Sequence, residues 1–239
     1  MFNMYVEDLI KGTWKELHKN IIEEFLIYLN KNSNDYVLKG GTALMECYGL
    51  ERFSEDIDLD SRNNSTIFDI VEKFTVEKKY NFRVAKKTST VSRFMLHYGG
   101  YNELGDKPLK IEISHRCERN PENVTKINGI LVYDINEIAS MKAFAYGNRD
   151  KLRDLFDLTY IFNHKKNLLN KYTISNIFKA ISRKGLEQFD YITKTQHDAL
   201  IDNDKLAIEF LTMYENLDIQ DSDNQDLINY QEHTSPSVF

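Results

Sequence analysis

A strand with carboxylates along one face is the feature that most constrains this chain. Residues 56–60 read Asp-Ile-Asp-Leu-Asp, so acidic and aliphatic side chains alternate with the period of two of a β-strand. One face would pack into a core, and the other would carry Asp56, Asp58 and, further along, Asp60. Neighbouring carboxylates repel, and a shared divalent cation is the usual resolution. The alternative is an acidic edge strand that faces solvent.

A glycine pair precedes this strand. Tyr36-Val-Leu forms a short apolar strand that runs into Gly40-Gly41, and residues 42–48 then have a helical pattern. We expect Thr42 to cap that helix and Gly49 to end it. Backbone N–H groups at a helix N-terminus favour a phosphate, although glycine pairs also occur in plain turns.

A third carboxylate stands in another alternating segment. Residues 109–114 read Leu-Lys-Ile-Glu-Ile-Ser, and Glu112 is a polar position of this predicted strand. A neighbouring or antiparallel strand could bring Glu112 beside Asp56 and Asp58. Three carboxylates on adjacent strands would suit two-metal phosphoryl transfer. The alternative is that Glu112 faces solvent on a half-buried strand.

The remaining patterns indicate a mixed N-terminal half and a helical C-terminal half. Apolar spacing predicts helices near residues 6–30 and 65–79, whereas strand patterns occupy residues 82–91, 93–98, 109–114 and 129–133. Turns are expected at residues 99–100 and 105–108. After Asp134 the patterns are helical, notably over residues 138–158, 174–181 and 205–214. We therefore predict an α/β domain over residues 1–134, a helical domain over 135–216 and an acidic, mobile tail over 217–239.

Composition narrows the classes of function. The net charge of -6 disfavours a protein that coats nucleic acid by electrostatics alone, because such binding needs a surplus of Lys and Arg. A local basic patch could still bind it, and residues 78–93 are the candidate, the alternative being a solvated surface. Cys47 and Cys117 form no metal-binding or disulfide pattern. We see no membrane span and no secretory signal, so we expect a cytoplasmic protein with no membrane partner.

The order of the motifs resembles a known family. Gly40-Gly41-Thr42-Ala43-Leu44, followed by Arg52-x-Ser54-x-Asp56-Ile57-Asp58-Leu59, is similar to the first two motifs of the AbiEii/AbiGii toxin family. That family belongs to the polymerase-beta-like nucleotidyltransferase superfamily. Its further signature, a helical Lys and then Arg-Asp-x-x-Asp, resembles Lys142 and residues 153–157. The similarity spans residues 37–158.

The resemblance implies a fold, a reaction and a set of site residues. The fold is a mixed sheet with helices of the nucleotidyltransferase type, followed by a helical half. The reaction moves a nucleoside monophosphate from an NTP to an acceptor hydroxyl. Members of the family are type IV toxins that are encoded beside an antitoxin. Some similar proteins add nucleotides to tRNA. The implied nucleotide-binding residues are Gly40, Gly41, Thr42, Arg52 and Ser54. Asp56 and Asp58 would hold Mg2+ or Mn2+, with Glu112 as a third ligand. The implied catalytic set is Asp56, Asp58, Lys142 and Asp154, supported by Arg153 and Asp157.

Taken alone, the helical residues have plainer explanations. Lys142 could be one more exposed helix lysine, and Asp154 could cap a helix or pair with a nearby base such as Arg153 or Lys151. Two other functions also remain open. One is an inactive nucleotide-binding interaction module. The other is a metal-dependent nuclease, which the Gly40-Gly41-Thr42 turn disfavours because hydrolysis needs no triphosphate cradle.

Overall fold

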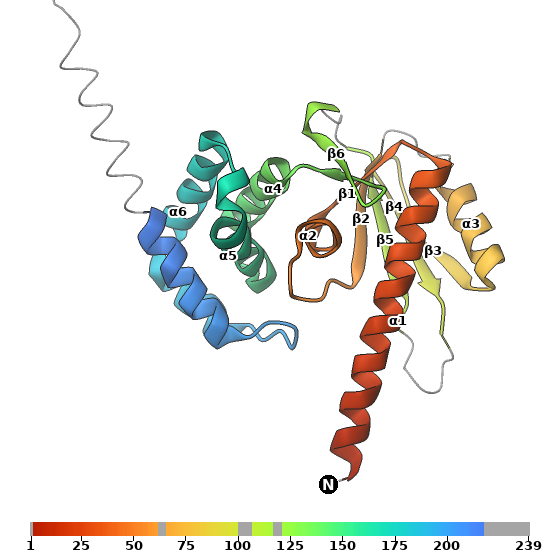
Figure 1. The fold of residues 1–239 in the computed structure, drawn as a ribbon, viewed down its shortest axis with the longest axis horizontal. Helices are drawn as coiled ribbons and strands as arrows, with labels where there is room; N and C mark the ends of the chain where they lie inside the picture. The colour runs from red at the N-terminus through yellow and green to blue at the C-terminus, as the bar shows by residue number, and fades with distance from the viewer. Residues whose placement is uncertain (1, 62–65, 100–106, 117–120, 218–239) are drawn as a thin grey trace, which may run out of the picture. The chain divides into compact units, whose positions relative to one another are not determined.

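The computed structural model describes residues 2–61, 66–99, 107–116 and 121–217, and it divides the chain into two compact units, Met1–Ile138 and Ala139–Phe239 (Figure 1). The expected division after residue 134 lies four residues before this one. Cys117, the turn residues 100 and 105–106, and residues 218–239 of the predicted tail lie outside the described residues. None of the described helices is both long enough and apolar enough to span a bilayer.

The first unit is built around one mixed sheet. Its seven strands lie in the order β3-β4-β5-β2-β1-β7-β6. β2 pairs in parallel with β5 and antiparallel with β1, and β1 pairs in parallel with β7. The elements, in chain order, are α1 (Phe2–Asn32), β1 (Tyr36–Lys39), α2 (Gly40–Tyr48), β2 (Asp56–Ser61), α3 (Thr66–Lys78), β3 (Asn81–Lys87), β4 (Val91–His97), β5 (Leu109–Ser114), β6 (Val124–Ile127) and β7 (Ile130–Tyr133).

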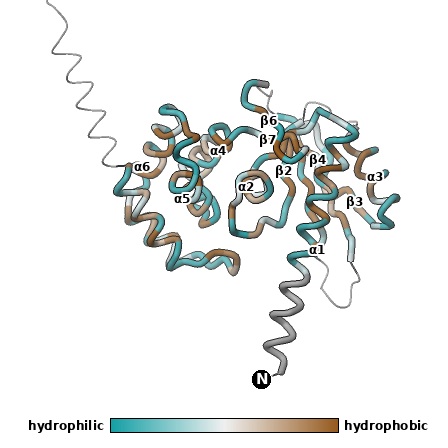
Figure 2. Tube along the Cα trace, in the orientation of Figure 1, coloured by the Kyte–Doolittle hydropathy of each residue, from teal (hydrophilic) through white to brown (hydrophobic). Residues whose placement is uncertain are grey.

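The two faces of this sheet differ in character. On one face Phe68 of α3 packs against Phe82 and Phe94, and Phe25 of α1 meets Phe74 of α3 with ring centroids 5.2 Å apart. Hydrophobic residues run along the central strands that these helices cover (Figure 2). α2 packs against β1, β2 and β7. The predicted site carboxylates Asp56, Asp58 and Glu112 alternate with the apolar residues of β2 and β5.

Three local expectations were wrong. α2 begins at Gly40, two residues before Thr42, and its N-cap is Lys39. β3 ends at Lys87 instead of continuing to residue 91, because the Thr88 N–H bonds to the Val91 carbonyl oxygen and closes a turn. Strand β6 was not expected at all, since Val124–Ile127 alternates only weakly. Gly49 does end α2, with a left-handed φ of 77°.

The second unit is helical, as the sequence predicted. It contains most of α4 (Ile135–Asn148), then α5 (Leu152–Lys165), α6 (Lys171–Thr195) and a further helix over residues 203–217. Asn170 caps α6 by accepting a 2.8 Å bond from the Thr173 N–H. Gly185 interrupts α6 with a φ of 65°. The fold class inferred from the sequence, a mixed sheet with helices followed by a helical half, is therefore confirmed.

Candidate active site

The carboxylates of β2 and β5 lie in one row because the two strands are parallel neighbours. Asp56 is paired in register with Lys110, and Asp58 with Glu112. Residues paired in this way project from the same face of a sheet. The structure thus places Asp56, Asp58 and Glu112 on one face, through a parallel and not an antiparallel pairing.

Basic side chains neutralise the outer members of this row. Lys110 Nζ lies 2.6 Å from Asp56 Oδ2, and Arg93 Nη2 lies 2.6 Å from Glu112 Oε2. Burial lowers the pKa of Lys110, but the hydrogen bond and charge of Asp56 outweigh it and leave that pKa raised. The sequence had not indicated Lys110 or Arg93 as site residues, although both are the polar positions of alternating strands.

Asp58 is the least compensated carboxylate of the row. Burial raises its pKa; the Lys110 charge opposes that shift, and the charges of Asp56 and Glu112 add to it. A divalent cation would relieve this repulsion, and carboxylate oxygens are the ligands that Mg2+ prefers. Asp56 and Asp58 therefore fit a bound cation. As placed, the described residues contain no ready group of three His, Cys, Asp or Glu ligands, and Glu112 is turned to Arg93.

The glycine turn lies directly against this row. Gly40 has a φ of 76°, and a Cβ at that position would lie 3.1 Å from Asp58 Oδ2. A Cβ on Gly41 would lie 2.8 Å from Arg52 Nη2 and 2.9 Å from Ser54 Oγ. The turn needs glycine at both positions, because side chains of the predicted site approach its backbone from two directions.

Thr42 has a structural task in place of the cap that was expected. Its hydroxyl donates to the Asp56 carbonyl oxygen and lies 2.9 Å from Ser54 Oγ, and the side chain is buried. These bonds tie the first turn of α2 to the start of β2. Any contact of Thr42 with a triphosphate would therefore come from its backbone.

Arg52 places a positive charge beneath the same turn. Its side chain is only 5% exposed, it donates to the Phe53 carbonyl oxygen at 3.2 Å, and its Nη2 lies under Gly41. A buried guanidinium beside the N-terminus of a helix strengthens the attraction of that N-terminus for anions. Arg52 and Ser54 thus belong to the surroundings of the glycine turn.

The predicted residues of α4 and α5 form a second cluster, within the helical unit. Lys142 Nζ lies 3.2 Å from Asp154 Oδ1 and 2.7 Å from Asp157 Oδ2. Both carboxylates are almost fully buried, and Lys142 is 13% exposed. Asp154 and Asp157 lie one helical turn apart, so together they hold a fixed ammonium group.

Arg149 completes this cluster, and Arg153 does not. Arg149 Nε lies 2.7 Å from Asp154 Oδ2, whereas Arg153 Nε pairs with Asp198 at 2.5 Å. Asp154 thus pairs with a nearby base, as its plainer explanation held, and the base is Arg149 in place of the suggested Arg153 or Lys151. Arg149 stands between two helices, where no periodicity marks it.

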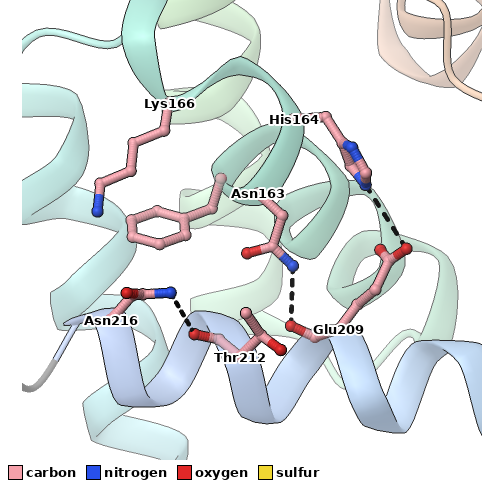
Figure 3. Close-up of a pocket in the computed structure, with 7 residues that line it drawn as sticks. Asn163, His164, Lys166, Glu209, Thr212 and Asn216 are labelled. Atoms are coloured by element: carbon pink, nitrogen blue, oxygen red, sulfur yellow. Dashed lines mark hydrogen bonds and ion pairs between the residues drawn. The ribbon is translucent and has the colours of Figure 1, made fainter.

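Two cavities lie in the helical unit. One, of about 380 Å³, is lined by Arg149, Lys151, Leu152, Arg153, Asp154, Gln196, His197 and Asp198. The other, of about 300 Å³, lies beside Lys166, whose Nζ is 4.8 Å from the Phe162 ring centroid (Figure 3). Asn163 there donates to the Glu209 carbonyl oxygen at 2.9 Å. No predicted site residue lines the second cavity.

Comparison with known proteins gives three kinds of match. A family model described as the nucleotidyl transferase AbiEii toxin of a type IV toxin–antitoxin system matches residues 26–231. An uncharacterized protein of Aquifex aeolicus is 30% identical over 135 residues. That alignment covers 54% of this chain and 58% of the relative, so the chain spans little more than half the length of the curated relative that it matches.

Solved structures share the fold. JHP933 from Helicobacter pylori is 27% identical and has a TM-score of 0.75, covering 92% of this chain and 98% of its own. A putative nucleotidyltransferase from H. pylori is 26% identical with a TM-score of 0.70, covering 85% and 94%. MenT4, a nucleotidyltransferase toxin of Mycobacterium tuberculosis, is 16% identical with a TM-score of 0.53, covering 86% and 85%, and it shows similarity of fold alone.

Proposed function

The chain belongs to the AbiEii nucleotidyl transferase toxin family of type IV toxin–antitoxin systems, and from this membership we propose that it transfers a nucleoside monophosphate from an NTP to a hydroxyl of an RNA, with tRNA as the first candidate. The family match confirms the resemblance that the motifs indicated. The observation that carries the proposal is the row of Asp56, Asp58 and Glu112 against the Gly40-Gly41 turn. That arrangement joins cation ligands to an anion-binding helix N-terminus.

Asp56 and Asp58 are the proposed ligands of Mg2+, or of Mn2+. When bound, the metal ion would orient the triphosphate and neutralise its charge. Glu112 is the proposed third carboxylate. It lies beside Asp58 in the register, and Arg93 holds its Oε2.

The glycine turn and Arg52 would bind the triphosphate. The backbone of Gly40 and Gly41 carries no side chain that would keep a phosphate away, and Arg52 lies under it as a buried cation. The Thr42 hydroxyl ties the turn to the start of β2 by donating to the Asp56 carbonyl oxygen, and it lies 2.9 Å from Ser54 Oγ. These contacts hold the turn in one geometry, which would lower the cost of ordering it when a triphosphate binds.

In the proposed reaction the acceptor oxygen attacks the α-phosphorus of the NTP. A new phosphoester bond forms, the bond from the α-phosphorus to the bridging oxygen breaks, and pyrophosphate leaves. The acceptor proton passes to a carboxylate, for which Glu112 is favoured over Asp154. Both oxygens of Asp154 accept bonds from Lys142 and Arg149, whereas the contacts of Arg93 go to Oε2 of Glu112. Lys142 and Asp154 remain members of the catalytic set implied by the family.

Asp56→Asn tests the assignment. Purified protein is incubated with Mg2+, each labelled NTP in turn and total tRNA, and we expect label in RNA that the variant no longer produces. Asp190→Asn is the matched control, because Asp190 is 62% exposed on α6, where its pair with Lys194 contributes little. Full activity of Asp56→Asn would refute the site.

The other outcomes separate the alternatives. Label only in protein would redirect the search to a protein acceptor, and RNA shortening would indicate a nuclease. NTP binding without any product would indicate the inactive interaction module. The family also implies an antitoxin, so co-expression with the product of a neighbouring gene is expected to relieve growth arrest that requires Asp56.

A further inference from the structure

The β3–β4 hairpin carries a concentration of positive charge in an otherwise acidic chain. Residues 78–93 include six basic residues and no acidic residue, although the net charge of the chain is -6. Four of the six lie on the two strands of the hairpin: Arg83, Lys86, Lys87 and Arg93. β3 is an edge strand of the sheet, and all but one of its side chains are exposed. The question is which face of the sheet these charges occupy.

The strand register determines which face of the sheet Lys86 occupies. Lys86 is paired with Arg93, Arg93 with Glu112, and Glu112 with Asp58. Directly paired residues project from the same face. Lys86 therefore ends a line of paired residues across the strands that begins at the proposed metal ligand Asp58.

A second line of paired residues runs across the strands beside the first. Arg83 is paired with Met95, Met95 with Lys110, and Lys110 with Asp56. Arg83 accordingly shares the face of Asp56. Arg83 and Lys86 are three positions apart, so in a regular strand they would project from opposite faces. The β-bulge between Val84 and Lys86 brings both onto the same face.

The charges of these two lines are balanced near β2 and unbalanced at the edge strand β3. Lys110 is engaged by Asp56, and Arg93 by Glu112. Among the described residues, Arg83 and Lys86 have no acidic partner, and both are exposed. Neighbouring strands lie about 4.8 Å apart, so the edge is about 14 Å from β2. A short stretch of an acceptor strand can span that distance.

We propose that the face of β3 formed by Arg83 and Lys86 binds the phosphodiester backbone of the RNA acceptor and directs its terminal hydroxyl towards Asp56 and Asp58. This inference rests on the proposed function, since it supplies the acceptor site of that reaction. Edge strands also use charge to prevent pairing with other chains. That purpose does not require the charges to lie on the face of the carboxylates, so it does not explain why both basic residues are cross-strand neighbours of Asp56 and Asp58 through the ladder.

The test compares two doubly charge-reversed proteins. Arg83→Glu/Lys86→Glu alters the proposed RNA site. Lys31→Glu/Lys73→Glu makes the same change of charge at exposed positions of α1 and α3 in the same unit. Affinity for 5′-fluorescein-labelled total tRNA is measured by anisotropy at several salt concentrations. Transfer of labelled NMP is measured with RNA and NTP varied separately.

We expect the β3 variant to bind RNA about tenfold more weakly than the control, with a salt slope smaller by about 1.4 to 1.8 for two lost phosphate contacts. Its KM for RNA should rise, while its KM for NTP stays that of the control. Equal RNA affinity of the two variants would overturn the inference and favour an acidic protein as the partner of this edge. RNA binding by the wild type that depends on β3, without transfer of label, would contradict the proposed function and leave the RNA-binding face standing.

Discussion

At the scale of single residues, Gly41 offers a sharp prediction. Gly41→Ala would place a Cβ 2.8 Å from Arg52 Nη2 and 2.9 Å from Ser54 Oγ, so something must shift. We expect a loss of about 1–3 kcal/mol in the free energy of unfolding and weaker NTP binding. Gly147→Ala is the control, since a Cβ there meets nothing within 4 Å; in a helix it should stabilise by up to about 1 kcal/mol. Urea unfolding of both variants measures this, and two equal losses would contradict it.

Lys142 and Lys194 make a second pair for comparison. Lys142→Met would remove the ammonium group that lies 2.7 Å from the fully buried carboxylate of Asp157, and we expect a cost of about 3 kcal/mol. Lys194→Met breaks a pair whose members are 73% and 62% exposed, for which about 0.5 kcal/mol or less is expected. Denaturant titrations of the two variants give the difference directly. A Lys142→Met protein as stable as Lys194→Met would mean that the buried carboxylates find other partners.

The positions of the carboxylates in the first unit could be predicted better than the ion pairs of the helical unit. Asp56 and Asp58 follow from strand alternation, and Glu112 follows from the same rule on β5. The pairing of Asp154 with Arg149 could not be predicted, because Arg149 lies outside the helical period and reaches back from a connection. Alternation along a strand predicts which side chains share a face of the sheet, whereas an ion pair between helices depends on how those helices pack.

At the scale of elements, the contact between α1 and α2 contains a pH-sensitive group. Burial, and then the nearby charge of Glu23, raise the pKa of Glu46 to about 7. The folded state therefore holds a proton that the unfolded state releases near pH 4.5, and stability falls as the pH rises from about 4.5 to about 7. Glu46→Gln should be about 1 kcal/mol more stable than the wild type at pH 8, with allowance for a partly exposed site, and equal to it near pH 4.5. Unfolding at both pH values tests this; a difference that is independent of pH would contradict it.

Among the elements, those with strong periods were predicted and those set by turns were not. α3 and β5 were expected almost at their observed bounds, because each has a clear apolar face. The turn at Thr88 was missed since it lacks glycine and proline and is closed by a hydroxyl and a backbone bond. The strands that carry the candidate site, β2 and β5, could therefore be predicted from the sequence, whereas the face occupied by Lys86 depends on a bulge that no sequence pattern marks.

At the scale of the whole molecule, the two compact units predict unfolding that is not two-state. Calorimetry should show two transitions, and the NTP substrate with Mg2+ should raise the one that belongs to residues 1–138. At a ligand concentration of 100 times Kd the expected stabilisation is about 2.7 kcal/mol, a shift of several degrees. Asp56→Asn should abolish the shift and retain both transitions. A ligand-induced shift that is unchanged in Asp56→Asn would place the nucleotide elsewhere.

The parallel pairing of β2 with β5 also determines when the proposed site can assemble during synthesis. Parallel strands need a long crossover, and here α3, β3 and β4 lie between the two partners in the chain. Glu112 and Lys110 leave the ribosome some fifty residues after Asp58, and pairings so distant in sequence form slowly. A nascent or truncated chain that ends before β5 cannot assemble the charged row. In the proposed function, this delays transfer activity until the sheet is complete.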